Sequence, residues 1–252
     1  MSEATKVAFI TGANRGLGLE TARILGKQGI TVILGSRDLK KGQEAAEKLR
    51  GEGAKSVEAV RFDVNTTADH KEIYDYIAKK YGKLDILINN AGVFDEGGKR
   101  PGTADFNTTT TVGQGNLRKT FETNFFQPID LTVTLLPLIE KSSAGRIVNL
   151  SSVLGSLTLR ADPKSPIYGK KGFAYDASKT ALNAFTVHLA AQLRDTPIKV
   201  NSAHPGWVKT EMGGESAPME LSEGGKTSAQ LATLPADGPT GGFFHMGQPL
   251  PW

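Results

Sequence analysis

The chain of 252 residues contains no cysteine. This absence excludes disulfide bonds, thiolate catalysis and cysteine-based metal sites, and it agrees with a cytoplasmic location, which we expect. The first residues, MSEATKVAFITG, carry an acidic residue and no apolar segment before the first predicted strand, so they do not resemble a secretory signal. No apolar run approaches the roughly 20 residues that cross a bilayer. We therefore predict no membrane partner.

Strong charge of one sign is also lacking. The 30 basic residues are interleaved with 26 acidic ones, and the formal net charge is only +4. Such mixing is typical of solvated helix faces, so we predict no nucleic-acid partner. No group of His, Asp and Glu has metal-ligand spacing, and we predict no metal.

Short β-branched segments alternate along the chain with amphipathic helical segments. This alternation indicates a parallel sheet with helices on both faces, a three-layer α/β/α sandwich in one domain. The predicted strands are 6–11, 31–36, 57–64, 84–92, 145–152, 198–206 and 241–247, and the predicted helices are 17–28, 38–50, 66–81, 111–140, 174–194 and 226–234.

Three glycines, Gly12, Gly16 and Gly18, lie between the first predicted strand and the first helix. Glycines at this junction let the backbone approach a pyrophosphate, and the helix N-terminus supplies free N–H groups. A tight strand-to-helix turn would need similar glycines. The apolar strand before them and the amphipathic helix after them favour a dinucleotide.

The second strand ends in GSRD, where NAD sites usually place an acid for the ribose 2′-hydroxyl. Ser36 stands at that position, Arg37 follows it, and Arg15 lies within the glycine loop. Two guanidinium groups can bind a 2′-phosphate, so we predict NADP(H) as the cofactor. Asp38 could turn inward as the missing acid, but it fits better as the N-cap of the next helix.

A Tyr–Lys pair at helical spacing occurs twice, as Tyr76 with Lys80 and as Tyr175 with Lys179. Either pair would lie on one helix face, because residues four positions apart are one turn apart. An ammonium beside a tyrosine favours its phenolate, so such a pair could serve acid–base catalysis, but the same spacing also occurs by chance. The spacing alone does not decide between the two pairs.

Five ordered motifs decide it: TGANRGLG, NNAG at 89–92, GRIVNLSS at 145–152, YDASK at 175–179 and HPGWVKT at 204–210. With them the chain resembles the short-chain dehydrogenase/reductase family over nearly its whole length. The segments HPGWVKTEMGG and GPTGGFFHMG are most similar to its NADPH-dependent carbonyl reductase branch. The resemblance implies a Rossmann-type fold with a seven-stranded parallel sheet.

The resemblance also implies the catalytic residues. Tyr175 would be the general acid and base, and Lys179 would favour its phenolate and hold the nicotinamide ribose. Ser152, rather than Ser151, would donate a hydrogen bond to the substrate oxygen. Asn124 would anchor a water molecule beside the lysine for proton relay. Tyr76 and Lys80 precede NNAG, so we interpret them as a structural pair.

Cofactor and substrate positions follow from the same resemblance. His204, before a Pro-Gly turn, is interpreted as structural. The expected substrate pocket is apolar, although core packing would explain some of its members equally well: Phe94, Val153, Leu154, Tyr168, Trp207 and Met212. The expected cofactor contacts are Gly12, Asn14, Arg15, Gly16, Leu17, Gly18, Arg37, Asp63, Val64, Asn90, Ala91, Gly92, Tyr175, Lys179, Pro205, Gly206, Val208 and Thr210.

Tyr175 follows Ser152 by 23 positions. The usual interval in the family is about a dozen, so some ten residues must loop out beside the active site. The loop is cationic and contains prolines, which suits a solvated surface better than a subunit interface. We therefore expect a monomer or a weak homodimer rather than a tetramer, unless the loop folds only toward the substrate.

These observations predict one domain over 1–252. Residues 1–92 would form mainly the dinucleotide-binding half, 111–252 the catalytic and substrate half, and 210–225 a substrate lid. The predicted function is NADPH-dependent interconversion of ketones or aldehydes and alcohols. The alternatives are a 3-oxoacyl or hydroxysteroid enzyme, and an NADP-binding sensor without turnover. A sensor would not need the Tyr, Lys, Ser and Asn set.

Overall fold

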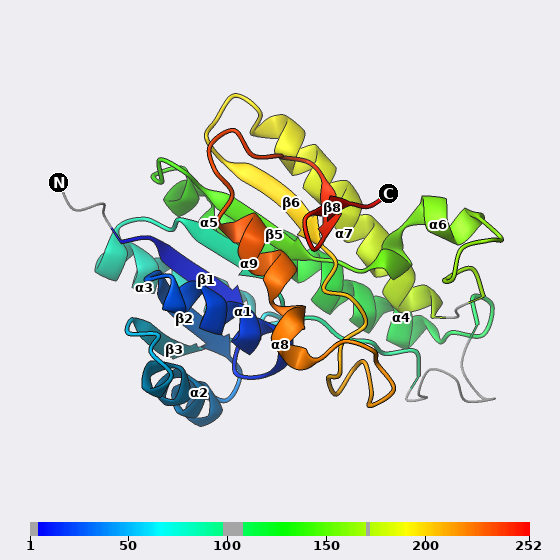
Figure 1. Ribbon diagram of the computed structural model, residues 1–252, viewed down its shortest axis with the longest axis horizontal. Helices are drawn as coiled ribbons and strands as arrows, with labels where there is room; N and C mark the ends of the chain where they lie inside the picture. The colour runs from blue at the N-terminus through cyan, green and yellow to red at the C-terminus, as the bar shows by residue number, and fades with distance from the viewer. Residues whose placement is uncertain (1–4, 98–107, 170–171) are drawn as a thin grey trace.

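The computed structural model describes residues 5–97, 108–169 and 172–252. Within them one eight-stranded sheet has the order β3-β2-β1-β4-β5-β6-β7-β8 (Figure 1). Neighbouring strands pair in parallel, except that β7 and β8 are antiparallel. The strands are β1 (Val7–Thr11), β2 (Thr31–Ser36), β3 (Val57–Arg61), β4 (Ile86–Asn89), β5 (Arg146–Leu150), β6 (Lys199–Ala203), β7 (Phe243–His245) and β8 (Gln248–Pro249).

The predicted single-domain Rossmann-type sandwich is confirmed in its class, and one detail of the sheet differs. We predicted seven parallel strands, and the structure adds the two-residue β8. Met246 and Gly247 take positive φ values of 48° and 79°, which reverse the chain so that Gln248–Pro249 pairs back on β7. A strand this short carries too few residues for a periodic signal.

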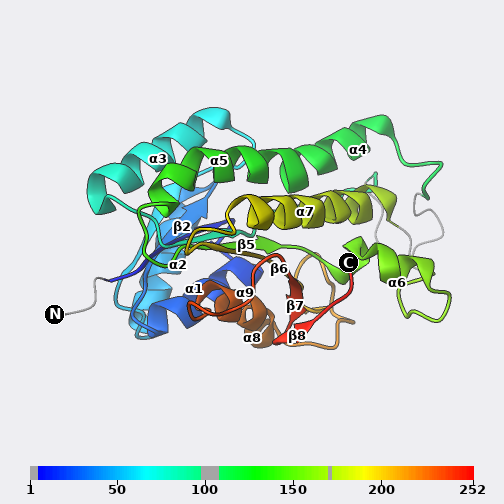
Figure 2. The ribbon, with the colours of Figure 1, turned by 90° about the horizontal axis from the view of Figure 1, so that it is seen from above.

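Helices cover both faces of the sheet (Figure 2). One face carries α1 (Gly16–Lys27), α2 (Leu39–Gly51), α8 (Leu221–Gly224) and α9 (Lys226–Ala232). The other carries α3 (Thr67–Tyr81), α4 (Gln114–Phe121), η1 (Glu122–Phe126), α5 (Gln127–Ile139) and α7 (Phe173–Gln192). Among the described residues no helix is long and apolar enough to span a membrane.

Two hydrophobic cores lie on the two faces of the sheet. Alternate residues of β1 point to opposite faces, so Ile10 joins one core and Phe9 joins the other. Both side chains are fully buried. Coverage on both sides explains why the strands are nearly continuous apolar runs rather than alternating ones.

The predicted helix 111–140 is interrupted. The structure divides it into α4, the π-helical turn η1 and α5, and η1 contains Asn124. The irregular segment expected after β5 contains two short helices, η2 (Val153–Gly155) and α6 (Leu157–Ala161). A π-helical turn holds one more residue than an α-helical turn, and it often occurs at functional sites.

The strand order places a crevice at the carboxyl end of the sheet. The chain leaves β1 toward β2 and β3 on one side, and it returns to β4 on the other. Ligands of open α/β sheets bind where the strand order reverses in this way. The glycine loop after β1 and the segments after β4, β5 and β6 all lie at this edge.

Candidate active site

The catalytic residues predicted from the sequence lie together where β5 meets α7. Tyr175 stands in the first turn of α7 and Lys179 one turn later, and both are buried. Lys179 Nζ lies 5.5 Å from the centroid of the Tyr175 ring and donates a hydrogen bond to Leu150 O at 2.7 Å. Ser152 follows β5, and its side chain lies close enough to the Tyr175 phenol to lower the pKa of that group.

Burial shifts both titratable groups toward their neutral forms. It raises the pKa of Tyr175 to about 12, against a smaller lowering by the Ser152 side chain. It also lowers the pKa of Lys179 to about 8. Lys179 can therefore exchange a proton near neutral pH, which an exposed lysine cannot do.

Asn124 connects the loop after β4 to α7. Its Oδ1 accepts from Val93 N at 2.8 Å, and its Nδ2 donates to Val93 O at 2.9 Å and to Ser178 Oγ at 3.0 Å. A Cβ on Gly92 would lie 3.2 Å from Asn124 Oδ1 and 3.5 Å from Lys179 Nζ. Asn124 thus borders Lys179 and fixes the backbone beside it, while its role in anchoring water stays a prediction.

The glycine loop packs closely against the segment after β4. Gly12 and Gly16 have φ values of 63° and 58°, which other residues rarely adopt. A Cβ on Gly18 would lie 2.6 Å from Asn90 Nδ2, and that same amide donates to Thr11 O at 2.7 Å. The backbone here can approach a pyrophosphate, and Gly16 opens helix α1.

Both arginines expected at the 2′-phosphate are exposed, and Arg15 also has an acidic partner. Arg15 precedes α1 and forms an exposed ion pair with Glu211, and Arg37 is also exposed. Ser36 is buried and donates to Asp38 O at 2.7 Å. Asp38 caps α2 by accepting from Lys41 N at 3.2 Å, which confirms its predicted role as an N-cap.

Asp63 and Val64, expected beside the adenine, lie directly after β3. Asp63 N donates to Asp69 Oδ2 at 2.7 Å, and Val64 is buried. Asp69 also forms an ion pair with Arg61. These bonds fix the backbone after β3 at the cofactor edge of the sheet.

The segment after β6 is rigid where it was expected to hold the nicotinamide. Gly206 has a φ of 92°, and a Cβ there would collide with Met219 Sδ. Val208 is buried and forms an isolated β-bridge with Met219. Thr210 Oγ1 accepts from Gly213 N at 2.9 Å.

His204 belongs to the scaffold of the site. Its Nδ1 accepts from Val153 N at 3.3 Å, and its ring lies 5.0 Å from that of His245. Burial, helped by His245, lowers the pKa of His204 to about 3. The ring is therefore neutral at physiological pH and serves as a hydrogen-bond acceptor behind Ser152, in agreement with the structural interpretation.

Comparisons with known proteins identify the family of the chain. The family model described as short chain dehydrogenase matches residues 6–221. The chain belongs to the short-chain dehydrogenase family. It is therefore an oxidoreductase of the class that interconverts alcohols and carbonyl compounds.

Relatives of this short-chain dehydrogenase match over almost the whole chain. (+)-Neomenthol dehydrogenase of Capsicum annuum is 30% identical, with 96% of each chain covered. Carbonyl reductase [NADPH] 1 of Mus musculus is 32% identical over the full length of both chains. The structure of NADPH-bound carbonyl reductase from chicken fatty liver superimposes with a TM-score of 0.82 at 26% identity, covering 98% and 99% of the two chains.

The pocket residues expected in this short-chain dehydrogenase fall into two groups. Phe94 lies against Tyr175, with the ring centroids 4.9 Å apart. Val153 and Leu154 form η2 directly after Ser152, and Leu154 N donates to Ser152 Oγ at 3.2 Å. The second group is about half exposed, at 52%, 51% and 48% for Tyr168, Trp207 and Met212.

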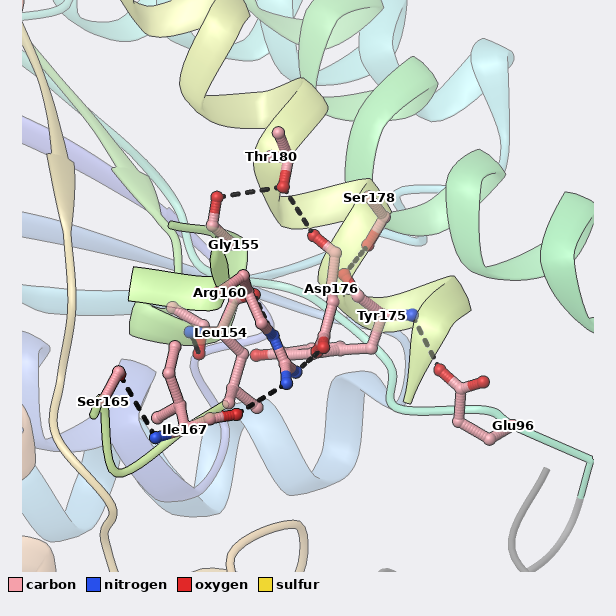
Figure 3. A network of polar contacts seen from close by, with 11 residues as sticks. Glu96, Leu154, Gly155, Arg160, Ser165, Ile167, Tyr175, Asp176, Ser178 and Thr180 are labelled. Carbon is pink, nitrogen blue, oxygen red and sulfur yellow. Dashed lines mark hydrogen bonds and ion pairs between the residues drawn. The ribbon is translucent and has the colours of Figure 1, made fainter. Parts of the chain in front are cut away.

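Three features of the dehydrogenase site escaped the sequence analysis. Thr11 Oγ1 accepts from Asn90 N and Ala91 N at 3.0 and 2.9 Å and so joins the two cofactor loops. Glu96 is buried and its Oε1 accepts from Tyr175 N at 2.8 Å (Figure 3). The third is an ion pair between Arg160 and Asp176. Thr11 begins a recognised motif, but no local signal links the other partners.

The second Tyr–Lys pair lies on α3 of the dehydrogenase, away from these residues. Lys80 Nζ donates to Tyr76 Oη at 3.1 Å and also pairs with Glu58. Glu58 and the tyrosine raise the pKa of Lys80. The described residues contain no group of three or more His, Cys, Asp or Glu that could hold a metal ion.

Proposed function

We propose that this short-chain dehydrogenase reduces ketones or aldehydes with NADPH and oxidises alcohols in the reverse direction. The observation that carries the proposal is the meeting of Ser152, Tyr175 and Lys179 at the end of β5, at the same sheet edge as the glycine loop. The carbonyl reductases among its relatives, one of them solved with NADPH, support it.

Each side chain has a distinct part in the proposed reaction. Bound NADPH supplies the hydride that reaches the carbonyl carbon. Ser152 donates a hydrogen bond to the carbonyl oxygen as negative charge develops there. Tyr175 transfers its phenolic proton to that oxygen, and its phenolate is then stabilised by the Lys179 ammonium.

Proton return to Tyr175 runs through Lys179. Its pKa of about 8 lets it hold a proton at neutral pH and yet release it. Asn124 fixes the backbone beside Lys179 Nζ, and we propose that it anchors the water that connects this amine to solvent. Without such a relay, the buried Tyr175 phenolate would regain its proton slowly.

The cofactor lies along the carboxyl edge of the sheet, with its pyrophosphate at the glycine loop after β1. The loop binds the pyrophosphate, Arg15 and Arg37 bind the 2′-phosphate, and the remaining contacts are those expected from the sequence. Arg15 forms an ion pair with Glu211, so the 2′-phosphate competes with this carboxylate for the guanidinium. Residues 210–225, which include Glu211, act as a lid over the substrate.

The substrate is an apolar carbonyl compound. Phe94 packs against the Tyr175 ring, and the apolar residues Val153 and Leu154 directly follow Ser152, which supports an apolar substrate. A relative is named for neomenthol, whose ketone is menthone, a bulky cyclic molecule of this kind.

Loss of NADPH absorbance with a panel of carbonyl compounds tests the function. The panel contains menthone, butanone, a 3-oxoacyl thioester and a 3-ketosteroid. Reduction of the simple ketones supports the proposal. Exclusive turnover of the thioester or the steroid would favour the specialist alternative, and NADPH binding without any turnover would favour a sensor.

We also propose a monomer or weak homodimer and a cytoplasmic location. The described part of the inserted loop contacts η2 and the first turn of α7. The outer face of η1, α5 and α7 exposes the apolar residues Phe126, Val133 and Val187, which would support a weak homodimer rather than oppose association. Light scattering at micromolar concentration decides: a stable tetramer of four 26.9 kDa chains would overturn the proposed state.

A further inference from the structure

The segment between Ser152 and Tyr175 packs tightly on the catalytic helix. We call its described residues, 153–169, the inserted segment. A Cβ on Gly155 would lie 2.8 Å from Lys179 Cβ, so only glycine allows η2 to approach α7 this closely. Thr180 Oγ1 donates to Gly155 O at 2.9 Å and fixes the contact.

Arg160, near the end of α6, holds the rest of the inserted segment together (Figure 3). Its Nε donates to Leu154 O at 3.4 Å and its Nη1 to Ile167 O at 2.7 Å. Its Nη2 forms an ion pair with Asp176 in the first turn of α7. The Arg160 and Asp176 side chains are only 18% and 15% exposed.

These partners come from three parts of the site. Leu154 belongs to the turn that begins at Ser152, Ile167 precedes the predicted pocket residue Tyr168, and Asp176 follows Tyr175. A guanidinium offers several donors in a fixed plane, so it can hold three backbone segments in one arrangement. A lysine at this place would offer only a point charge.

We propose that Arg160 is a positioning residue that holds the inserted segment as a wall of the substrate pocket and thereby selects among ketones. The proposal rests on the reductase function proposed above. The wall comprises Val153, Leu154 and Tyr168. Arg160 itself acts through these residues and through Asp176.

Other contacts keep Tyr175 in place when Arg160 is lost. Glu96 Oε1 accepts from Tyr175 N on the side away from α6, and Thr180 still binds Gly155. Loss of Arg160 should therefore free the Tyr168 end of the wall, while η2 and the proton donor stay in place. The expected effect is on recognition of bulky substrates rather than on the chemical step.

The first test compares Arg160→Met with Arg23→Met. Arg23 lies on α1 with a side chain that is also 18% exposed, and it pairs with Glu20 and Glu52 away from the pocket. We expect the ratio of kcat/KM for menthone to that for butanone to change by roughly tenfold or more in Arg160→Met, mainly through KM for menthone. NADPH affinity should stay within about threefold of wild type.

Arg23→Met should lower Tm without changing the ratio. If Arg160→Met left the ratio unchanged, or lowered kcat/KM for both ketones equally in step with Tm, the proposal would be overturned. A wild-type enzyme that reduces neither ketone would overturn the proposed function instead, so the two failures are distinguishable.

A double-mutant cycle supplies the second test. The menthone-to-butanone ratio of kcat/KM should be the same in the double variant Arg160→Met/Asp176→Asn as in Arg160→Met alone. The single substitution already removes the ion pair between Arg160 and Asp176, so the second has nothing further to remove. Arg160→Lys keeps a charge for Asp176 and should restore part of the wild-type ratio, and it also serves if the Met variant does not fold. Additive effects of the two substitutions would contradict the proposal.

Discussion

Tyr76 and Lys80 on α3 lie one helical turn apart, as do Tyr175 and Lys179 on α7. On α3 the lysine pairs with the carboxylate of Glu58, and the pKa of Lys80 is raised. On α7 the lysine amine donates to a backbone carbonyl, and burial lowers the pKa of Lys179 to about 8. The same spacing thus gives one amine that retains its proton and one that can exchange it.

The partner of the lysine, rather than its distance from the tyrosine, makes the difference. A carboxylate compensates the ammonium charge and stabilises it. A carbonyl oxygen in a buried site compensates it only in part, so the neutral amine becomes accessible. Catalysis by proton transfer needs the second arrangement, and each prediction below tests one aspect of this contrast.

The largest effect is expected from removal of the phenolic proton. Tyr175→Phe should lower kcat by about 10²–10⁴-fold, the usual contribution of general acid catalysis, and leave NADPH binding nearly intact. Tyr76→Phe removes the same atom on α3 and should change kcat little. Steady-state kinetics of both variants measure the effect, and similar losses in the two would refute the assignment.

Cofactor choice extends the contrast to the arginines. Arg15 has a carboxylate partner in Glu211, and an incoming 2′-phosphate must compete with it. Each charge-assisted bond to that phosphate contributes ~1.5–3 kcal/mol, so NADPH should be preferred over NADH by about tenfold or more. Ser36→Asp with Arg37→Gln should erode or invert the preference in kcat/KM. Equal values for both cofactors in the wild type would exclude the idea.

The pH dependence of the reaction reports Lys179 directly. Reduction consumes a proton, so kcat should fall as the pH rises through the pKa of Lys179, about 8. The limiting slope is about tenfold per pH unit. Lys80→Met should leave the profile unchanged because the raised pKa of Lys80 keeps it protonated there. A profile that is flat from pH 7 to roughly pH 10 would speak against a relay through Lys179.

The last effect is on stability. Lys179→Met should raise the free energy of unfolding at pH 7 by about 2 kcal/mol, because burying the ammonium costs about 3 kcal/mol and loss of its hydrogen bond to Leu150 O offsets about 1 kcal/mol of that. The folded pKa of Lys179 is depressed from 10.5 to about 8, so this cost is full below pH 8 and vanishes as the pH rises to 10.5. The gain of the variant should shrink over the same range in urea titrations.

Lys80→Met is the matched control for stability. It loses an ion pair with Glu58 that is partly exposed, so a loss of about 0–1 kcal/mol is expected. A destabilised Lys179→Met would show that its contact with Leu150 O outweighs the cost of burying the charge.

Local sequence patterns were sufficient to predict much of the structure. Strand segments, the tight turn at the glycine loop and the N-cap at Asp38 depend on residues near in sequence, and the structure confirms them. The contact of Glu96 with Tyr175 joins positions 79 apart, and Arg160 meets Asp176 only because the inserted segment turns back. Such contacts depend on the path of the chain, which periodicity does not encode. The additional strand β8 depends on two positive φ values for the same reason.

The π-helical turn η1 sets a rotational phase between α4 and α5. Each residue of an α-helix advances by about 100°, so one residue more or less turns everything beyond it by that angle. Asn124 meets Val93 only at the present phase. The long helix should therefore accept a polar substitution at the exposed Phe126, yet deletion of that residue should rotate Asn124 and α5 relative to each other and remove activity. In this segment, chain length is constrained more strictly than residue identity.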